Sequence, residues 1–538
     1  MDKIALGQIE IVKNNLDYNF QQIKEQISIA KNSGYEVIVF PMLCLSGNTI
    51  DDSYFNYDCQ SELLSYNDLI NELSDDIHVL FSNIFLQDME VFKGVYHSYN
   101  QEILCLHFDD LYSNSNSSLV YDGNTITVGF DRNYLVGDYN FIFANDYYIK
   151  DEDFKVECDN VVVYCNCVGT QNIDKHIYGF SGGSFISDNN IIIAQANNNF
   201  KSELVLNTIN NDKANLFSAL VNIIKSLDVQ IFPFKPNYVI GLSGGLDSSV
   251  NLALLVAAVG SKRVLGYNMA SKYNSDKTIS TALKQANKLG VKVKSGSIEP
   301  LVQATISNVS EYEDQCISDF ALENVQARIR GHLLSTFAAI NNGIVINNGN
   351  KVESALGYCT LYGDLIGAYS PIGDLYKVDL FELSQQINEY FAEEIISSDL
   401  LPNNDYQFII APSAELKNAQ VDPMKWFYHD LLIDYLLKTN FDLTYLLTIY
   451  ENGTIYDLEM GKWIKHYHLD DGDKFIADLD WIVQTINKNI FKRIVSPPLI
   501  VLSNNSFGNN FNQSQKGFSY TAQQLSLISK IKKEEYNG

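Results

Sequence analysis

Short apolar runs alternate with polar stretches in the first half of the chain. Apolar positions predict a strand over Ile4–Ile11, a helix over 16–30 and a second strand over 37–40, which ends at Pro41. A further strand is predicted over Val161–Val168, and the segment 182–194 predicts a closing hairpin. Strand, helix and strand at this spacing predict layered α and β structure.

In the second half, predicted strands alternate regularly with predicted helices. A fully apolar strand, Tyr238–Leu242, is followed by a glycine turn, a helix over 247–259 and a strand over 263–267. The alternation continues to Ile344–Ile346 and predicts a doubly wound parallel sheet of the Rossmann-like type. A polar stretch, Asn207–Asp212, precedes an amphipathic helix, so we expect one domain over 1–207 and another over 208–538.

Length and charge narrow the possible functions. The 538 residues suit two large domains, and a hydrophobic content of 46% is typical of a chain that forms cores. Lys plus Arg is 38 and Asp plus Glu is 65, which gives a net charge of −27. Such a surface repels phosphate backbones, so nucleic acid is not an expected partner and any phosphate site must be built locally.

Cysteine usage and apolar length bear on location. The eight cysteines have no regular spacing and no CxxC pair, which predicts thiols of a reducing compartment and favours the cytoplasm. The N-terminus shows no basic segment followed by an apolar one, so we expect no signal peptide. The longest apolar run, Val250–Val259, is too short to cross a bilayer, and no membrane role is expected.

The sharpest motif is Ser243–Ser249, which reads SGGLDSS between the predicted strand and helix. Glycines allow a tight turn, and successive amides with a helix N-terminus attract phosphate. No GK[ST] follows, and a carboxylate, Asp247, lies inside the loop, as expected if it holds Mg²⁺ beside phosphates. The alternative is a plain glycine turn in which Asp247 and Ser248 cap the helix.

In its context this motif resembles the pyrophosphate loop of N-type ATP pyrophosphatases, which cleave ATP between the α and β phosphates. Other strings agree in order: ENVQARIR at 323–330, NNGNKVESALGYCTLYGD at 347–364, DLYK at 374–377, PSAEL at 412–416 and the pair Lys492–Arg493. Together they resemble the NAD synthetase family, in its glutamine-dependent form with two domains. The resemblance covers most of residues 213–500.

The resemblance implies a reaction. In this family ATP activates the carboxylate of nicotinic acid adenine dinucleotide (deamido-NAD) as an adenylate, pyrophosphate leaves, and ammonia displaces AMP to give NAD. A carboxylate accepts ammonia poorly until it carries a good leaving group, and Mg²⁺ with nearby cations would neutralise the developing charge. The implied substrates are therefore ATP, deamido-NAD and a nitrogen donor.

By the same match, Asp247, Glu353 and Lys377 are the implied catalytic residues, with Asp247 and Glu353 as Mg²⁺ ligands. The implied ATP site comprises Gly241, Ser243, Gly244, Gly245, Asp247, Ser248, Ser249, Asn348, Lys377 and Ser413. The implied deamido-NAD site comprises Asn324, Arg328, Glu353, Tyr358, Cys359, Thr360 and Leu361, with Lys492 and Arg493 closing over phosphates. Two positions depart from the family: Asn348 stands where threonine is usual, and Ala270 where proline is usual. An amide at 348 can still form hydrogen bonds.

The first half resembles, over about a third of residues 1–205, the nitrilase-like amidohydrolase domain that supplies ammonia in such synthetases. This likeness implies an αββα sandwich. Its chemistry needs a Cys nucleophile, a Glu general base and a Lys that stabilises the oxyanion. The resembling segments are Ile4–Gln8, Gly34–Gly47 and 168–185.

All three catalysts are missing where the resemblance places them. Met42 follows Phe40-Pro41 in place of the Glu, no lysine occurs from Gly94 to Ile149, and the segment Asn140–Tyr148 contains no Cys. Cys44, Cys165 and Cys167 are interpreted as core residues. We therefore hypothesise that the first half is a scaffold or oligomer interface without glutaminase activity and that the enzyme uses free ammonia; a rearranged, active glutaminase is the alternative.

Other functions were weighed. GMP synthetase or a tRNA-modifying thiolase would share the ATP loop, but the charge of −27 and the string GNKVESALGY favour the NAD branch. A non-catalytic adenylate-binding protein is a rival that the retained charges of Asp247, Lys351, Glu353 and Lys377 disfavour. A metal site at Tyr467–Asp473 matches no known spacing and is expected to be an exposed turn. The resemblance also implies a homodimer or larger oligomer.

Overall fold

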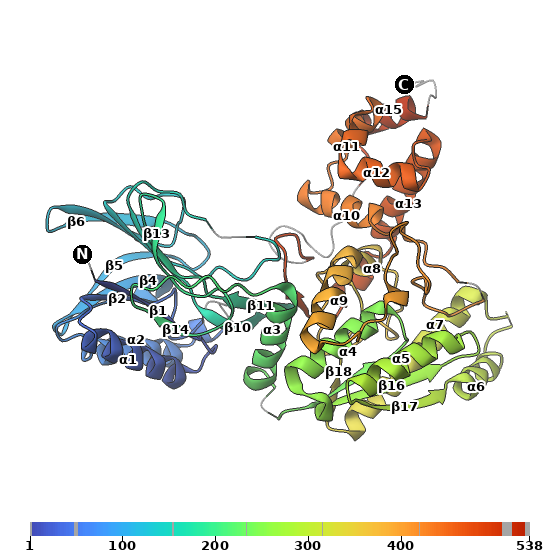
Figure 1. Cartoon of the computed structure of the whole chain (residues 1–538), viewed down its shortest axis with the longest axis horizontal. Coiled ribbons are helices and arrows are strands. Elements are labelled where there is room, and N and C mark those ends of the chain that lie inside the picture. Colours follow the sequence, from blue (N-terminus) through green and yellow to red (C-terminus); the bar gives the residue numbers. More distant parts are fainter. Residues whose placement is uncertain are drawn as a thin grey trace. The chain divides into compact units, whose positions relative to one another are not determined.

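The computed structural model describes residues 3–47, 52–152, 155–232, 234–314, 316–418, 420–507 and 519–532. The chain divides into two compact units, Met1–Pro233 and Phe234–Gly538 (Figure 1). The division falls later than the expected boundary at 207, because helix α3 (Leu216–Gln230) packs on strands β10 (Val168–Ile173) and β11 (His176–Ser181) of the first unit.

The described part of the first unit contains two six-stranded sheets, with strand orders β14-β1-β2-β3-β4-β5 and β13-β12-β9-β8-β7-β6, and the antiparallel pair β10–β11. In the first sheet β1 pairs in parallel with β2 and β2 with β3, and the other pairs are antiparallel. The strands are β1 (Ile4–Gln8), β2 (Val37–Val39), β3 (His78–Gln87), β4 (Glu90–Tyr99), β5 (Glu102–Asp110), β6 (Asn116–Tyr121), β7 (Asn124–Gly129), β8 (Tyr139–Phe143), β9 (Val161–Cys165), β12 (Phe185–Asp188), β13 (Ile191–Gln195) and β14 (Glu203–Val205).

The predicted strand over Val161–Val168 is two strands, β9 and β10, separated at residues 166–167. The break is stabilised by Asn166, whose Nδ2 donates to the carbonyl oxygens of Asp146 and Gly182, each at 2.9 Å. The predicted hairpin over 182–194 is confirmed as the antiparallel pair β12–β13.

Helices cover only one of these sheets in the described chain. Helices α1 (Leu16–Asn32) and α2 (Tyr57–Asn71) pack on the first sheet, while none of the described residues between β6 and β13 forms a helix. The α/β class and the paired sheets agree with the expectation, but the second helical layer of an αββα sandwich is missing from this part. The connecting segments, such as 144–160, lack an apolar period of 3.6 residues.

The second unit contains the predicted parallel sheet, with strand order β17-β16-β15-β18 and every pair parallel. Its strands are β15 (Asn237–Gly241), β16 (Val264–Ala270), β17 (Lys292–Ser297) and β18 (Gly343–Val345). The chain proceeds from β15 outward to β17 and then returns to add β18 on the other side of β15. Ligands in open α/β sheets bind where the strand order reverses in this way, outside the carboxyl ends of the strands.

Helices surround this sheet and build a separate helical region after it (Figure 1). The helical region has its own core, which includes Trp426, Leu432 and Phe475. The helices are α4 (Leu246–Val259), α5 (Asp276–Lys288), α6 (Glu299–Val309), α7 (Asp319–Ile340), α8 (Lys351–Leu356), α9 (Lys377–Phe391), α10 (Tyr428–Lys438), α11 (Thr444–Glu451), α12 (Glu459–His466), α13 (Gly472–Lys488), α14 (Ile490–Ile494) and α15 (Ala522–Ile531), with a short strand β19 (Leu499–Val501). No described helix is both long and apolar enough to span a bilayer.

Candidate active site

A cavity of about 300 Å³ lies within the second unit, at the carboxyl ends of β15, β16 and β18. Its walls come from the loop between β15 and α4, from α7 and α8, and from residues 410–416 with Asp422. This is the edge at which the order of the parallel strands reverses, so the sequence and the topology place the same loop at the expected position for a ligand.

The loop Ser243–Ser249 turns tightly at the floor of this cavity. Gly244 has a φ of +84°, and a Cβ at this position would lie 2.1 Å from the carbonyl oxygen of Thr278, so only glycine fits. Gly245 is the N-cap of α4 and makes no side-chain cap bond. The interpretation in which Asp247 or Ser248 caps the helix therefore fails, and the first amides of α4 remain available to an anion.

Acidic side chains surround the ammonium group of Lys377 beside this loop. The Nζ of Lys377 lies 2.7 Å from the Oδ2 of Asp247, and the lysine is 3% exposed at its side chain. Glu353 and Asp422 interact electrostatically with the same pair. The Oδ1 atoms of Asp247 and Asp422 are buried and have no hydrogen-bond partner among the described residues.

The proton affinities of this cluster follow from burial and mutual repulsion. Burial, with Asp247 and Asp422 nearby, raises the pKa of Glu353 well above its usual range, although Lys377 opposes the shift. Burial also raises the pKa of Asp422 to about 6. Burial would lower the pKa of Lys377, but Asp247 and Glu353 raise it overall. The cluster thus has more acid than one cation neutralises, a pattern typical of functional sites.

Eleven of the implied site residues line the cavity: Gly241, Ser243, Gly245, Asp247, Ser248, Asn348, Glu353, Tyr358, Cys359, Lys377 and Ser413. Asn348 fits its unusual position, because its Nδ2 donates to the carbonyl of Gly241 at 3.0 Å and its Oδ1 accepts from Asn251 at 3.0 Å. The hydroxyl of Ser413 donates to the carbonyl of Gln420 at 2.8 Å.

The other implied residues do not line this cavity: Gly244, Ser249, Asn324, Arg328, Thr360, Leu361, Lys492 and Arg493. Lys492 donates through Nζ to the carbonyls of Gly357 and Cys359, at 2.7 and 2.6 Å. Arg493 is 3% exposed and donates to the carbonyls of Ala355 and Ile486. Since the last carbonyls of α8 need donors, these two cations stabilise the end of that helix in this arrangement and do not reach over the cavity.

Lys351, which the sequence reading counted among the retained catalytic charges, is buried away from the cavity. Its Nζ lies 2.8 Å from the Oδ1 of Asp374, and the two side chains are 0% and 1% exposed. Asp374 also accepts hydrogen bonds from the hydroxyl of Ser503 and from the backbone amide of Leu502. The pair therefore fixes the start of α8 and the approach to Lys377 as a structural element.

Four charged residues that line the cavity had been given no role from the sequence. Arg330, Asp364, Glu415 and Asp422 line the cavity. Burial lowers the pKa of Arg330 to about 10 and raises that of Asp364. Arg330, Asp364 and Glu415 lie inside strings already singled out by resemblance, so those strings were the available signal; Asp422 carries no comparable local motif.

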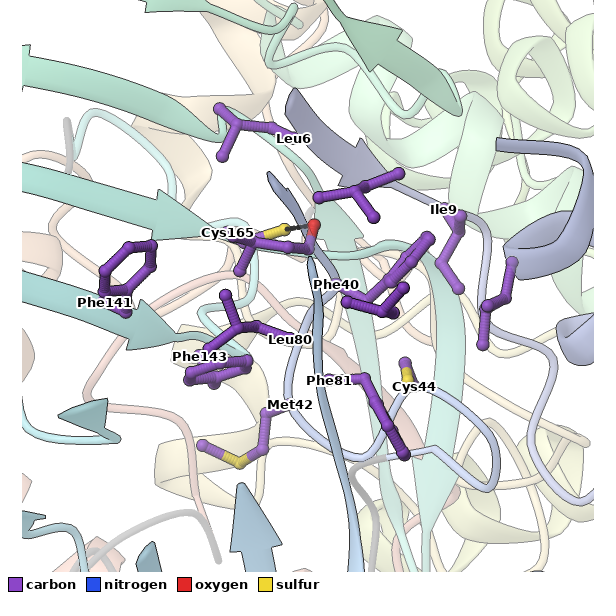
Figure 2. Packing of buried hydrophobic residues seen from close by; sticks show 14 of the residues in the cluster. Leu6, Ile9, Phe40, Met42, Cys44, Leu80, Phe81, Phe141, Phe143 and Cys165 are labelled. Carbon is purple, nitrogen blue, oxygen red and sulfur yellow. Dashed lines mark hydrogen bonds between the residues drawn. The ribbon is translucent and has the colours of Figure 1, made fainter. Parts of the chain in front are cut away.

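The first unit presents the opposite picture at the positions of the expected glutaminase residues. Met42 is 3% exposed and packs in the apolar core with Phe143 and Leu80 (Figure 2). Its amide donates to the carbonyl of Ala144 at 3.4 Å, within the segment where a Cys was expected. The position where the Glu was expected is thus adjacent in space to the segment where the Cys was expected.

The buried cysteines of this unit are core residues, as predicted. Burial raises the pKa of Cys44 to about 12, and its Sγ lies 3.4 Å from the carbonyl of Ser82. Cys165 is fully buried, and its Sγ lies 3.2 Å from the carbonyl of Val39. Burial raises its pKa as well, so neither thiol has the thiolate character of a nucleophile.

The candidate metal turn at Tyr467–Asp473 connects the end of α12 to the start of α13. Asp471 is the N-cap of α13, and its side chain accepts from the amides of Asp473 and Lys474. In the part of the chain that the structure describes, no group of three or more His, Cys, Asp and Glu side chains is placed to hold a metal ion. The carboxylate at 471 therefore has a capping role.

Sequence comparisons agree with this geometry. Residues 216–444 match the family model described as NAD synthase. The chain is 27% identical to a glutamine-dependent NAD(+) synthetase of Acinetobacter baylyi over 480 residues, which cover 80% of this chain and 86% of that protein. It is 39% identical to the glutamine-dependent NAD(+) synthetase of a Synechocystis species, over 34% of this chain and 31% of that protein.

Solved structures share the fold over nearly the whole chain. The glutamine-dependent NAD+ synthetase of Acinetobacter baumannii, in complex with ADP, has a TM-score of 0.65 at 21% identity and covers 96% of this chain and 99% of its own. The glutamine-dependent NAD(+) synthetase of Cytophaga hutchinsonii has a TM-score of 0.69 at 13% identity and covers 98% and 99%. Residues 216–444 therefore form an NAD synthase domain, and the fold of the whole chain is that of the glutamine-dependent NAD synthetases.

Proposed function

We propose that this protein converts deamido-NAD to NAD, using ATP and free ammonia and releasing AMP and pyrophosphate. The observation that carries the proposal is the cavity in which the Ser243–Ser249 loop and the pair Asp247–Lys377 meet Glu353. The family model and the synthetase relatives support the same reaction.

The loop suits the triphosphate of ATP. Amides at the start of α4 and the hydroxyls of Ser243 and Ser248 offer donors, and α4 adds the positive end of its dipole. The dinucleotide carboxylate attacks the α phosphorus of ATP, the bond to the β phosphate oxygen breaks, and pyrophosphate leaves. Ammonia then attacks the carbonyl carbon of the adenylate and expels AMP, with loss of a proton.

Lys377 is suited to this chemistry because its ammonium group is held in one position. The ammonium lies within hydrogen-bond distance of Asp247 and is shielded from solvent, so it can stabilise negative charge without reorganising. We propose that Asp247 and Glu353 hold Mg²⁺. The fit rests on the unpartnered Oδ1 of Asp247 and on the raised pKa of Glu353, since a divalent cation would relieve the repulsion between these acids. When bound, the ion would neutralise charge on the phosphates.

The residues of the first unit bear on which nitrogen donor the protein uses. Met42 cannot accept a proton at neutral pH, and the adjacent position 144 is alanine, so neither a general base nor a nucleophile is present at these two places. The names of the relatives favour the alternative, a glutamine-dependent synthetase with a rearranged glutaminase. We propose free ammonia because the apolar packing around Met42 is incompatible with acid–base chemistry.

The decisive experiment compares nitrogen donors. Purified full-length protein is incubated with ATP, Mg²⁺ and deamido-NAD, and NAD and AMP are quantified with ammonium or with glutamine as the donor. We expect NAD formation with ammonium and none above background with glutamine. Strong glutamine-driven activity that one cysteine substitution abolishes would refute ammonia dependence. No AMP release with either donor would favour a non-catalytic adenylate-binding protein.

Quaternary structure and location remain proposals. We propose a homodimer or larger assembly, by resemblance to the family, in which synthetase domains pair. Light scattering at working concentration tests this, and a monomer would contradict it. A cytoplasmic location, favoured by the cysteine pattern, is tested by fractionating cells that produce the protein.

A further inference from the structure

Three segments of the second unit meet at the side chain of Glu415, near the loop Ser243–Ser249, which is called the ATP loop below after its proposed ligand. Its Oε2 accepts a hydrogen bond from the Nδ2 of Asn274 at 2.9 Å and another from the hydroxyl of Thr278, also at 2.9 Å. Asn274 belongs to the loop after β16, Thr278 to the first turn of α5, and Glu415 to the stretch 410–416, which lines the cavity.

Thr278 carries this connection to the ATP loop. Its carbonyl oxygen occupies the place where a Cβ on Gly244 would stand, at 2.1 Å, so the backbones of α5 and of the ATP loop are in close contact. Thr278 is 6% exposed and has little freedom to move independently. The carboxylate that holds the side chain of Thr278 therefore also fixes the surface against which Gly244 turns.

Asn274 extends the connection in the other direction. Its Oδ1 accepts from the amide of Ser271 at 2.7 Å and from the Nη2 of Arg330 at 3.1 Å. Arg330, on α7, also donates through Nε to the carbonyl of Met269 at 3.0 Å, at the end of β16. Glu415 thus belongs to a continuous network that joins α5, α7 and the carboxyl end of β16 around the cavity.

The backbone of Glu415 is itself held in an unusual conformation. Its φ is +47°, in the left-handed region that residues other than glycine seldom adopt. Its amide donates to the hydroxyl of Ser413 at 3.1 Å, the residue that the resemblance assigns to ATP. Such a conformation persists only where the surroundings determine it, and functional sites are where it is concentrated.

We infer that Glu415 is a positioning residue for ATP, which holds the ATP loop against α5 and fixes Ser413 through its own backbone. The inference rests on the proposed function, because it presumes that ATP binds in this cavity. Glu415 acts through Thr278, Asn274 and Ser413 and does not itself take part in the transfer. Loss of its carboxylate should weaken ATP binding and leave the chemical step and the dinucleotide affinity nearly unchanged.

The test measures binding of ATP with Mg²⁺ to the full-length protein by calorimetry, without deamido-NAD. We expect Glu415→Ala to raise the Kd for ATP about tenfold, the size typical of changes along a coupled network. Glu415→Gln keeps an acceptor oxygen and should stay within about twofold of the natural protein. The matched control is Glu299→Ala on α6, which loses one exposed hydrogen bond from Gln303 and should bind ATP normally.

Binding by Glu415→Ala as tight as that of the natural protein would overturn the inference while leaving the proposed function intact. Failure of the natural protein to bind ATP at all would instead refute the proposed function. The two failures are therefore distinguishable in one titration series.

A second measurement separates positioning from loss of folding. At saturating ATP we expect Glu415→Ala to keep kcat within about twofold, with the KM for ATP raised and the KM for deamido-NAD unchanged. Thr278→Val removes the hydroxyl partner, and the double variant should bind ATP no more weakly than Glu415→Ala alone. Fully additive losses, or equal losses in kcat and in both KM values with a lower Tm, would contradict the inference.

Discussion

The cavity of the second unit and the corresponding region of the first unit differ in what surrounds their key positions. In the second unit, Asp247 and Lys377 form a nearly buried ion pair with Glu353 and Asp422 close by. In the first unit, the amide of Met42 donates to the carbonyl of Ala144, and the side chain of Met42 lies among apolar side chains (Figure 2). Both units bury charged side chains, Lys93 among them in the first unit, but the cluster of acids around one lysine lies in the second.

The difference shows that buried charges indicate a functional site. Unpaired buried charges are costly, so a cluster of three acids around one lysine persists only where ligands or ions complete it. Without that requirement, an apolar side chain such as Met42 fills the space and stabilises the core. The residues of the charged cavity are therefore explained by ligand binding, whereas the residues around Met42 are explained by packing.

The largest expected effect comes from removing the cation of the charged cavity. Lys377→Met leaves Asp247, Glu353 and Asp422 without their ammonium partner, and we expect kcat to fall about a thousandfold, as for loss of a preorganised charge stabiliser. AMP release measures the effect. Lys438→Met, which breaks an exposed pair with Asp434, should leave kcat unchanged; a loss of less than about tenfold for Lys377→Met would contradict the role of this lysine.

A smaller but still large effect is expected at the ATP loop. Gly244→Ala places a Cβ against the carbonyl of Thr278, so we expect ATP affinity to fall about a hundredfold, since the loop must move off α5. Gly453 has a similar φ of +79° with nothing within 4 Å of its missing Cβ, and Gly453→Ala should cost only about 1 kcal/mol of stability. Equal ATP affinities of the two variants would show that the loop contact is irrelevant.

The apolar region can be challenged by restoring an acid. Met42→Glu buries an unpaired carboxylate at a position that is 3% exposed, and we expect about 3 kcal/mol of lost unfolding free energy and no gain of glutamine hydrolysis. Met42→Leu should cost less than about 1.5 kcal/mol. Denaturant unfolding and ammonia release are the measurements. Glutamine hydrolysis gained by Met42→Glu would show that the first unit keeps the remaining catalysts.

The smallest expected effect is a loss of stability of the first unit at low pH. In the first unit the Nδ1 of His78 lies 2.8 Å from the Nε2 of His97, and burial, together with His78, lowers the pKa of His97 to about 4. The unfolded chain has a histidine pKa of about 6.5, so the stability contributed by neutral His97 is full above that pH and is lost as the pH falls towards 4. Tm curves from pH 7 to 4.5 test this. His97→Gln should flatten the dependence, and an unchanged curve would count against it.

Within the second unit, some features were predictable from sequence and others were not, for a physical reason. The parallel sheet and the loop at Gly244 followed from local patterns, because apolar runs and a strand–glycine–helix order leave few alternatives. Arg493 was assigned to phosphate on its charge and its match, but the structure uses it to satisfy carbonyls at the end of α8. Helix ends need donors that no local pattern reveals.

The sequence by itself determined the two-part α/β organisation and the glycine loop Ser243–Ser249, because both follow from contiguous residues. It also predicted that a Glu, a Lys and a Cys are absent from the three segments where the resemblance places them. Tertiary structure alone decided which charges share a cavity: Asp422 joins Lys377, while Lys351 is withdrawn into a pair with Asp374. It also placed Glu415 between Thr278 and Asn274. Such contacts join residues far apart in the chain, and their energies depend on burial and distance, which only the folded molecule sets.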